Sequence, residues 1–168
     1  MKYKKGGVID YHGYVDASFG CHQDGKSHSG MAVFLDREGS GSIYWKSNKQ
    51  TTTADSVAEA ELISLNDNIK VIILINNILG SIYIMRIPVT IHEDNTAVID
   101  MMEVGKSTLE GKRKFIRRKF FICKEYIELE EVRLEATPTT KMRANCLTKP
   151  ARSTHLITMC KSLFGILI

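Results

Sequence analysis

The segment SIYWKSNKQTTTADSVAEAELISLNDNI, residues 42–69, changes in the middle from a strand pattern to a helical one. Its first five residues, SIYWK, are typical of a short β-strand. From Ala54 onward the apolar residues recur at helical spacing, which predicts a helix that runs to about Gly80, a suitable C′ residue. The segment therefore predicts a sheet whose third strand leads into a long buried helix.

Two further strands are predicted before this segment, over residues 7–17 and 31–35. Residues 36–39, DREG, supply a turn before the third strand. Short gaps that contain glycine favour hairpins, so the first three strands are expected to be antiparallel.

After the long helix, strands and helices alternate. In chain order we expect a strand at 89–92 preceded by Pro88, a helix at 96–102 capped by Asn95, an amphipathic helix at 112–128, a strand at 132–136, and a last helix interrupted near Pro150. Later strands that alternate with helices need crossover connections. The predicted fold class is therefore α/β, a mixed five-stranded sheet with helices on both faces.

Composition indicates one globular domain over residues 1–168, with 1–11 as a loosely ordered lead-in and 151–168 as a C-terminal helix. Hydrophobic residues make up 43% and charged residues 25%, which excludes a disordered or collagen-like chain. The spacing of the four cysteines matches neither a zinc site nor a disulfide framework, so reduced thiols are expected. The apolar run 71–85 is too short to span a bilayer, so no membrane partner is expected.

Three acidic residues stand out: Asp16 and Glu61, which are each flanked by apolar residues, and Asp94, which follows the strand predicted at 89–92. In the predicted fold they lie in the first strand, the first turns of the long helix and the end of the fourth strand. A carboxylate near a core is costly unless it is paired or binds a metal. Converging oxygen ligands without His or Cys would select Mg²⁺ or Mn²⁺. The alternative is an ordinary strand-end Asp, a helix-surface Glu and an Asp before a helix cap.

Six blocks of sequence resemble, in order and spacing, the ribonuclease H domain at the C-terminal end of a Ty1/copia-type retrotransposon polyprotein. The blocks span roughly residues 12–150 and are GYVDA (13–17), GKSHSG (25–30), IYWKSNKQ (43–50), AEAE (58–61), EDNTA (93–97) and LTKP (147–150). The resemblance implies a ribonuclease H-like fold, with the same mixed five-stranded sheet.

The resemblance also implies an activity, the two-metal-ion cleavage of the RNA strand of an RNA/DNA hybrid during reverse transcription. By this resemblance, Asp16, Glu61 and Asp94 would bind two Mg²⁺ ions, for which Mn²⁺ could substitute. Glu59 lies two positions from Glu61 and is expected to point elsewhere. The family is joined to a reverse transcriptase, which implies that domain of the same polyprotein as a partner. No small-molecule cofactor is implied, and the expected location is a cytoplasmic retrotransposon particle or the nucleus.

At the fourth acidic position of the family, this chain has Asn145. An amide oxygen still reaches a cation but brings no negative charge, so weaker binding of the second ion and slower turnover are expected. The substitution keeps a second hypothesis open, a catalytically impaired domain that serves as a nucleic-acid-binding or structural module. A third is a nuclease or integrase of the same fold that acts on DNA.

A basic segment begins the helix predicted at 112–128. Six cations there, which outnumber the net charge of +4, are expected to follow the phosphates of a nucleic acid, although such runs are often only solvated. They are Lys112, Arg113, Lys114, Arg117, Arg118 and Lys119. Secondary contacts implied by the resemblance are Lys26, Ser27 and Ser29.

Overall fold

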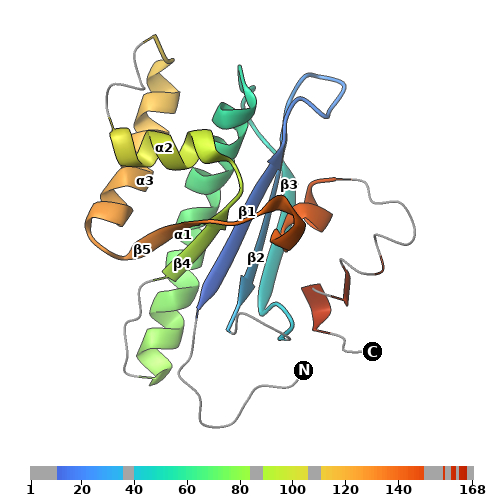
Figure 1. Cartoon of the computed structure of the whole chain (residues 1–168), viewed down its shortest axis with the longest axis vertical. Coiled ribbons are helices and arrows are strands. Elements are labelled where there is room, and N and C mark those ends of the chain that lie inside the picture. The colour runs from blue at the N-terminus through green and yellow to red at the C-terminus, as the bar shows by residue number, and fades with distance from the viewer. Residues whose placement is uncertain are drawn as a thin grey trace.

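The computed structural model describes residues 11–35, 40–83, 89–105 and 111–149, with positions 157, 160, 161 and 163–165 near the C-terminus. The elements of the described residues (Figure 1) are β1 (His12–Ser18), β2 (His28–Phe34), β3 (Tyr44–Lys49), α1 (Val57–Tyr83), β4 (Val89–Glu93), α2 (Thr96–Val104), α3 (Lys114–Glu128), β5 (Val132–Ala136) and the 3-10 helices η2 (Thr139–Lys141) and η3 (Asn145–Leu147). The turn predicted at 36–39 and most of the predicted lead-in and C-terminal helix lie outside the described residues.

The five strands form one sheet in the order β3-β2-β1-β4-β5. β1 pairs antiparallel with β2, and β2 with β3, while β4 runs parallel to β1 and β5 parallel to β4. This topology confirms the predicted mixed sheet with an antiparallel start. It also places the C-terminal ends of β1 and β4 side by side, because parallel neighbours end at the same edge.

Both faces of the sheet are covered, which is why β1 is buried along almost its whole length. The three α-helices pack on one face and form the larger core with strand residues such as Val15, Val33 and Ile91. On the other face, Tyr14 and Phe34 pack against residues from the chain around η3 and near the C-terminus. Figure 1 shows these two layers on opposite sides of the sheet.

The end predicted for the long helix is wrong, since α1 passes through Gly80 and extends to Tyr83. A glycine inside a helix costs only about 1 kcal/mol relative to alanine, which tertiary packing can offset. Leu79 supplies such packing because it contacts the main core. By length and composition, residues 57–82 would be able to cross a membrane, but half of that window is buried in the protein, as in a core helix.

Two predicted strand boundaries also shift. β2 begins at His28 instead of residue 31, and β3 extends to Lys49 instead of residue 46. The added residues pair with each other across the two strands, His28 with Lys49 and Gly30 with Ser47. Backbone pairing therefore extends both strands through polar residues that show no apolar strand pattern.

β2 and η3 approach each other closely at Gly30. A Cβ atom added to Gly30 would lie 2.7 Å from Cγ2 of Thr148 and 2.9 Å from Cβ of Leu147. The hydroxyl of Ser47 donates to the carbonyl oxygen of Leu147 at 2.6 Å. Because Gly30 is the register partner of Asp16, this contact holds η3 and the residues after it beside Asp16.

Candidate metal centre

Three carboxylates from separate elements meet at the edge of the sheet where β1 and β4 end. Asp16 comes from β1, Asp94 follows directly after β4, and Glu61 lies in the second turn of α1. One oxygen of each lies within 4.8 Å of the other two. The structure therefore brings together the three acids that the sequence indicated, at a spacing that one cation can bridge.

Asp16 and Glu61 are buried, with 0% and 4% of their surface exposed. Burial raises the pKa of Asp16, although hydrogen bonding and charge from Thr148 and Lys149 oppose it. Burial, followed by the charges of Glu93 and Asp16, raises the pKa of Glu61 to about 10. Among the residues that the structure describes, none forms a hydrogen bond with Oε2 of Glu61. The metal-free site thus holds negative charge poorly, which favours a bound cation or a proton.

Glu93 is a fourth acid near this site that the sequence reasoning missed. Its side chain is fully buried, and burial raises its pKa to about 8. Oε1 accepts from the backbone N–H of Asn95 at 3.1 Å, while Oε2 has no hydrogen-bond partner. Strand alternation was the available signal, because Val89, Ile91 and Glu93 share one face of β4 and the first two are core residues.

Asn145, the expected fourth ligand, is buried in η3 with both ends of its amide engaged. The nitrogen donates to the carbonyl oxygen of Thr139 at 2.8 Å, and the oxygen accepts from Nζ of Lys149 at 2.5 Å. Lys149 also contacts Oδ1 of Asp16 at 3.3 Å, and the hydroxyl of Thr148 donates to Oδ2 of Asp16. Lys149 and Thr148 therefore belong to the site, and the sequence had suggested no role for either.

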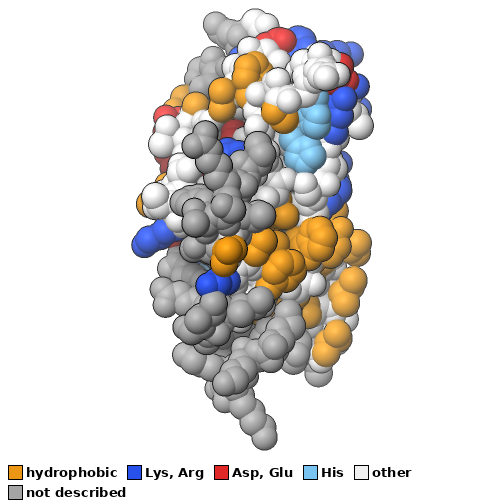
Figure 2. All heavy atoms as spheres, turned by 90° about the vertical axis from the view of Figure 1, so that its right-hand side faces the viewer, with side chains coloured by type: hydrophobic (Ala, Val, Ile, Leu, Met, Phe, Trp, Pro, Cys, Tyr) orange, Lys and Arg blue, Asp and Glu red, His pale blue; other side chains and the backbone are white. Residues whose placement is uncertain are grey.

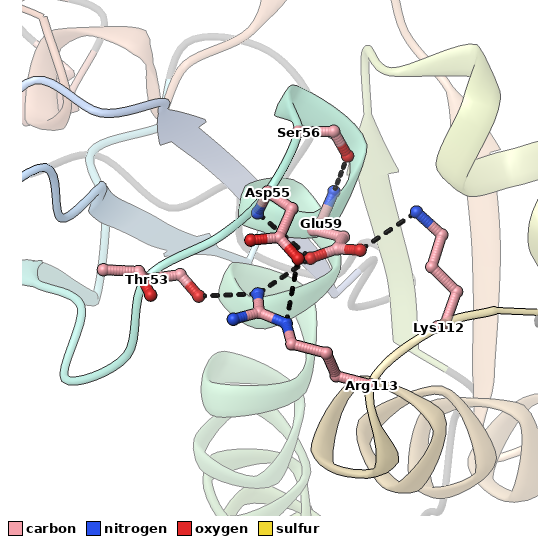
Figure 3. A network of polar contacts seen from close by, with 6 residues as sticks. All are labelled: Thr53, Asp55, Ser56, Glu59, Lys112 and Arg113. Atoms are coloured by element: carbon pink, nitrogen blue, oxygen red, sulfur yellow. Dashed lines mark hydrogen bonds and ion pairs between the residues drawn. The ribbon is translucent and has the colours of Figure 1, made fainter.

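The side chain of Glu59 points away from the cluster of three carboxylates, as its position two residues before Glu61 predicted. It is buried at 2% exposure and forms ion pairs with Lys112 and Arg113 at 2.9 and 3.0 Å (Figure 3). Burial alone would raise the pKa of Glu59, but hydrogen bonds from Lys112, Asp55 and Arg113 outweigh it and the pKa is lowered. Glu59 thus ties the start of α1 to the chain before α3.

A Glu59→Ala variant should lose about 1–2 kcal/mol of unfolding free energy, because Lys112 and Arg113 lose a buried partner. Urea unfolding at pH 7 measures the difference. Asp55→Ala is the matched control, since Asp55 pairs with the same Arg113 at 3.0 Å from a side chain that is 62% exposed. That control should lose about 0–0.5 kcal/mol. Equal losses in the two variants would contradict the assigned role of Glu59.

The basic segment divides into paired and exposed cations. Lys112 and Arg113 are held by Glu59, and Lys119 pairs with Asp67. Within the described parts of the chain, the other three cations of the basic segment have exposed side chains and form no ion pair. These are Lys114, Arg117 and Arg118 on α3.

Two of the secondary contacts predicted near the first hairpin have side chains that do not reach the surface. Ser27 and Ser29 are 0% and 1% exposed. The Ser27 hydroxyl accepts from the N–H of Gly20, and the Ser29 hydroxyl accepts from Nε2 of Gln50. Both serines hold loops in place. Lys26 is partly exposed and lies 3.7 Å from a carboxylate oxygen of Asp24.

His22 and His28 join this hairpin to Ser47 in the neighbouring strand β3. His22 and His28 share a hydrogen bond at 3.0 Å, and His28 contacts the hydroxyl of Ser47 at 2.8 Å. Burial, with a smaller effect of His22, lowers the pKa of His28. Figure 2 shows histidine side chains on this side of the molecule between a basic edge and an apolar patch. The histidines therefore brace the hairpin against the strand that supports η3.

No protein-family model matches the sequence. Among solved structures, LC11-RNase H1, isolated from compost by a metagenomic approach, is similar over 84% of this chain and 94% of its own, at 19% identity and a TM-score of 0.62.

Two foamy virus structures are also similar. The RNase H domain of PFV matches over 84% of this chain and 91% of its own, at 14% identity and a TM-score of 0.57. The prototype foamy virus protease-reverse transcriptase matches over 96% of this chain but 21% of its own, at 12% identity and a TM-score of 0.52. Together with the sheet order described above, these likenesses show that the chain has the ribonuclease H-like fold.

Proposed function

We propose that this chain is a metal-dependent endoribonuclease that hydrolyses the RNA strand of RNA/DNA hybrids. The observation that carries the proposal is the convergence of Asp16, Glu61 and Asp94, from three separate elements, to within 4.8 Å. A structural site gains nothing from placing three acids in contact, because like charges oppose folding. Such an arrangement is typical of a site whose function requires a cation.

The residues fit a hard divalent cation such as Mg²⁺ or Mn²⁺. All three donors are carboxylate oxygens, and Oε2 of Glu61 is buried without a partner. When bound, such an ion supplies Lewis-acid activation of water and of the scissile phosphate. The hydroxyl of Thr148 donates to Oδ2 of Asp16 and so helps to hold that carboxylate in orientation. A second ion, as the resemblance implies, would lack the negative charge of the family's fourth acid, because Asn145 brings none.

The hybrid as substrate is supported by the fold and by the exposed basic face of α3. LC11-RNase H1 has also been solved in complex with an RNA/DNA hybrid, and that structure matches this chain at 15% identity and a TM-score of 0.60. Lys114, Arg117 and Arg118 are exposed and available to phosphates. Four cations that pair with acidic side chains remain predicted contacts, and each would exchange its acidic partner for a phosphate. They are Lys112, Arg113, Lys119 and Lys26. Recognition would rest on backbone shape and 2′-hydroxyls.

We extend the proposal to the setting of the reaction. The sequence blocks resemble Ty1/copia-type polyproteins, and the similar foamy virus chain carries its matching region within a protease-reverse transcriptase. A reverse transcriptase domain of the same polyprotein is therefore the proposed partner, within a cytoplasmic retrotransposon particle or the nucleus.

Cleavage of an end-labelled RNA/DNA hybrid in Mg²⁺ and in Mn²⁺ tests the function. We expect the native chain to cut the RNA strand and leave duplex DNA of the same sequence intact. Asp16→Asn should reduce the rate by at least ~10²-fold, because it removes a charged ligand shared by the site. Equal cutting of the two substrates would instead favour a DNA nuclease.

A second candidate function, a non-catalytic module that binds nucleic acid, is favoured by one observation. Each end of the Asn145 amide already has a partner, Thr139 or Lys149, so the residue resembles a structural residue more than a ligand. Hybrid affinity measured beside cleavage separates the candidates. Tight binding without cutting in either metal would support the module and overturn the nuclease.

A further inference from the structure

The ammonium group of Lys149 lies between two residues that were expected to share a metal ion. Nζ is 2.5 Å from Oδ1 of Asn145 and 3.3 Å from Oδ1 of Asp16. The first is a residue one helical turn away, and the second comes from β1, 133 residues earlier in the sequence. A single positive group thus joins the two positions that a second divalent ion would have to bridge.

The charges of the site agree with this arrangement. Asp16, Glu61 and Asp94 carry three negative charges when they act as ligands, and Asn145 carries none. A second divalent ion near Asp16 and position 145 would lie beside the ammonium group of Lys149, and like charges repel each other. The ammonium group of Lys149, 3.3 Å from Oδ1 of Asp16, already supplies positive charge to this group of acids. The positive charge of Lys149 acts on both Asp16 and Glu61.

We propose that Lys149 takes the place of one divalent ion, so that the site binds a single ion through Asp16, Glu61 and Asp94 beside the fixed ammonium group. This inference rests on the proposed metal-dependent function. It explains how Asn145 is compatible with the remaining site, because an amide oxygen accepts a hydrogen bond from an ammonium group without needing a charge of its own.

Counting bound Mn²⁺ per chain tests the inference without any nucleic acid. Isothermal titration calorimetry on the intact chain, with electron paramagnetic resonance to count the ions, should give one ion for the native protein. Lys149→Met should also bind one ion, about tenfold more tightly, because the ammonium group opposes a nearby cation. The double variant Asn145→Asp with Lys149→Met restores a fourth acid and removes the ammonium group, and should bind two ions.

Two more variants sharpen the result. Lys149→Arg keeps the positive charge and should keep the single ion at close to native affinity. Lys141→Met removes an exposed lysine from η2, outside the site, and should match the native protein. The Lys149 side chain is itself 45% exposed, so its replacement should not disturb folding.

Two ions bound by the native chain, or unchanged affinity in Lys149→Met, would overturn the inference. These results are separable from the proposed function. A chain that binds one ion but cuts no hybrid would refute the nuclease and leave the role of Lys149 intact. A chain that cuts hybrid and binds two ions would do the reverse.

Discussion

Replacing Glu61 with glutamine should stabilise the metal-free chain while it lowers hybrid cleavage by on the order of 10³-fold. Burial and the neighbouring acids raise the pKa of Glu61 from an ordinary value of 4.5 to about 10. Between these two pH values the folded state keeps a proton that the unfolded state releases. The contribution of Glu61 to stability is therefore complete at low pH and declines as the pH rises.

Glutamine removes this decline because it has no proton to lose. At pH 8 without metal, the variant should exceed the native chain by on the order of 2–4 kcal/mol of unfolding free energy, and by much less at pH 5. Urea unfolding with EDTA at the two pH values measures the difference. Glu125→Gln, which changes an exposed acid on α3, is the control and should follow the native curve.

With Mn²⁺ added, the native chain should become more stable than Glu61→Gln. The ion stabilises the native chain by binding the folded state, and Glu61→Gln binds it more weakly. A variant that is less stable than the native chain at pH 8 without metal would show that the Glu61 carboxylate is a structural group, and would contradict the unfavourable burial of charge assigned to this site.

Replacing Gly30 with alanine should cost about 1–3 kcal/mol of unfolding free energy, because the new methyl group overlaps atoms of Leu147 and Thr148 that cannot move freely. Thr148→Ser removes the nearest overlapping atom, Cγ2, and retains the hydroxyl that donates to Asp16. The double variant Gly30→Ala with Thr148→Ser should therefore recover part of the lost unfolding free energy. A double-mutant cycle in urea measures this recovery.

Gly13→Ala is the matched control in the adjacent strand. Its methyl group would lie 2.8 Å from Cδ1 of Ile72, the end of a flexible side chain that can turn away. A smaller loss is expected than for Gly30→Ala. If Thr148→Ser recovered nothing in the double variant, η3 would not be held against β2 at Gly30.

Local patterns predicted the elements whose stabilising contacts are local. The strand at 132–136 was predicted at its observed bounds, and Asn95 caps α2 through the N–H groups of Ala97 and Val98. The polar end of β3 and the passage of α1 through Gly80 were missed. In both cases a partner distant in sequence, a paired strand or a core contact, outweighs the local preference.

The site shows the same division. Spacing and resemblance were enough to select Asp16, Glu61 and Asp94 among the acids of the chain and to notice Asn145. They did not find Glu93, and they did not reveal that the side chains of Ser27 and Ser29 are buried. A residue's type and position along an element indicate what it can do. Its exposure depends on what packs over it.

The sequence by itself determined the order of strands and helices and the antiparallel start of the sheet, since both follow from residue type and short-range periodicity. Together with the family resemblance, it also selected the three acids that converge. Only the tertiary structure decided the partners of the charged groups. It paired Glu59 with the basic segment and placed Lys149 between Asp16 and Asn145. The physical reason is that charge pairing depends on distances of a few ångströms between groups far apart in the chain, which folding alone establishes.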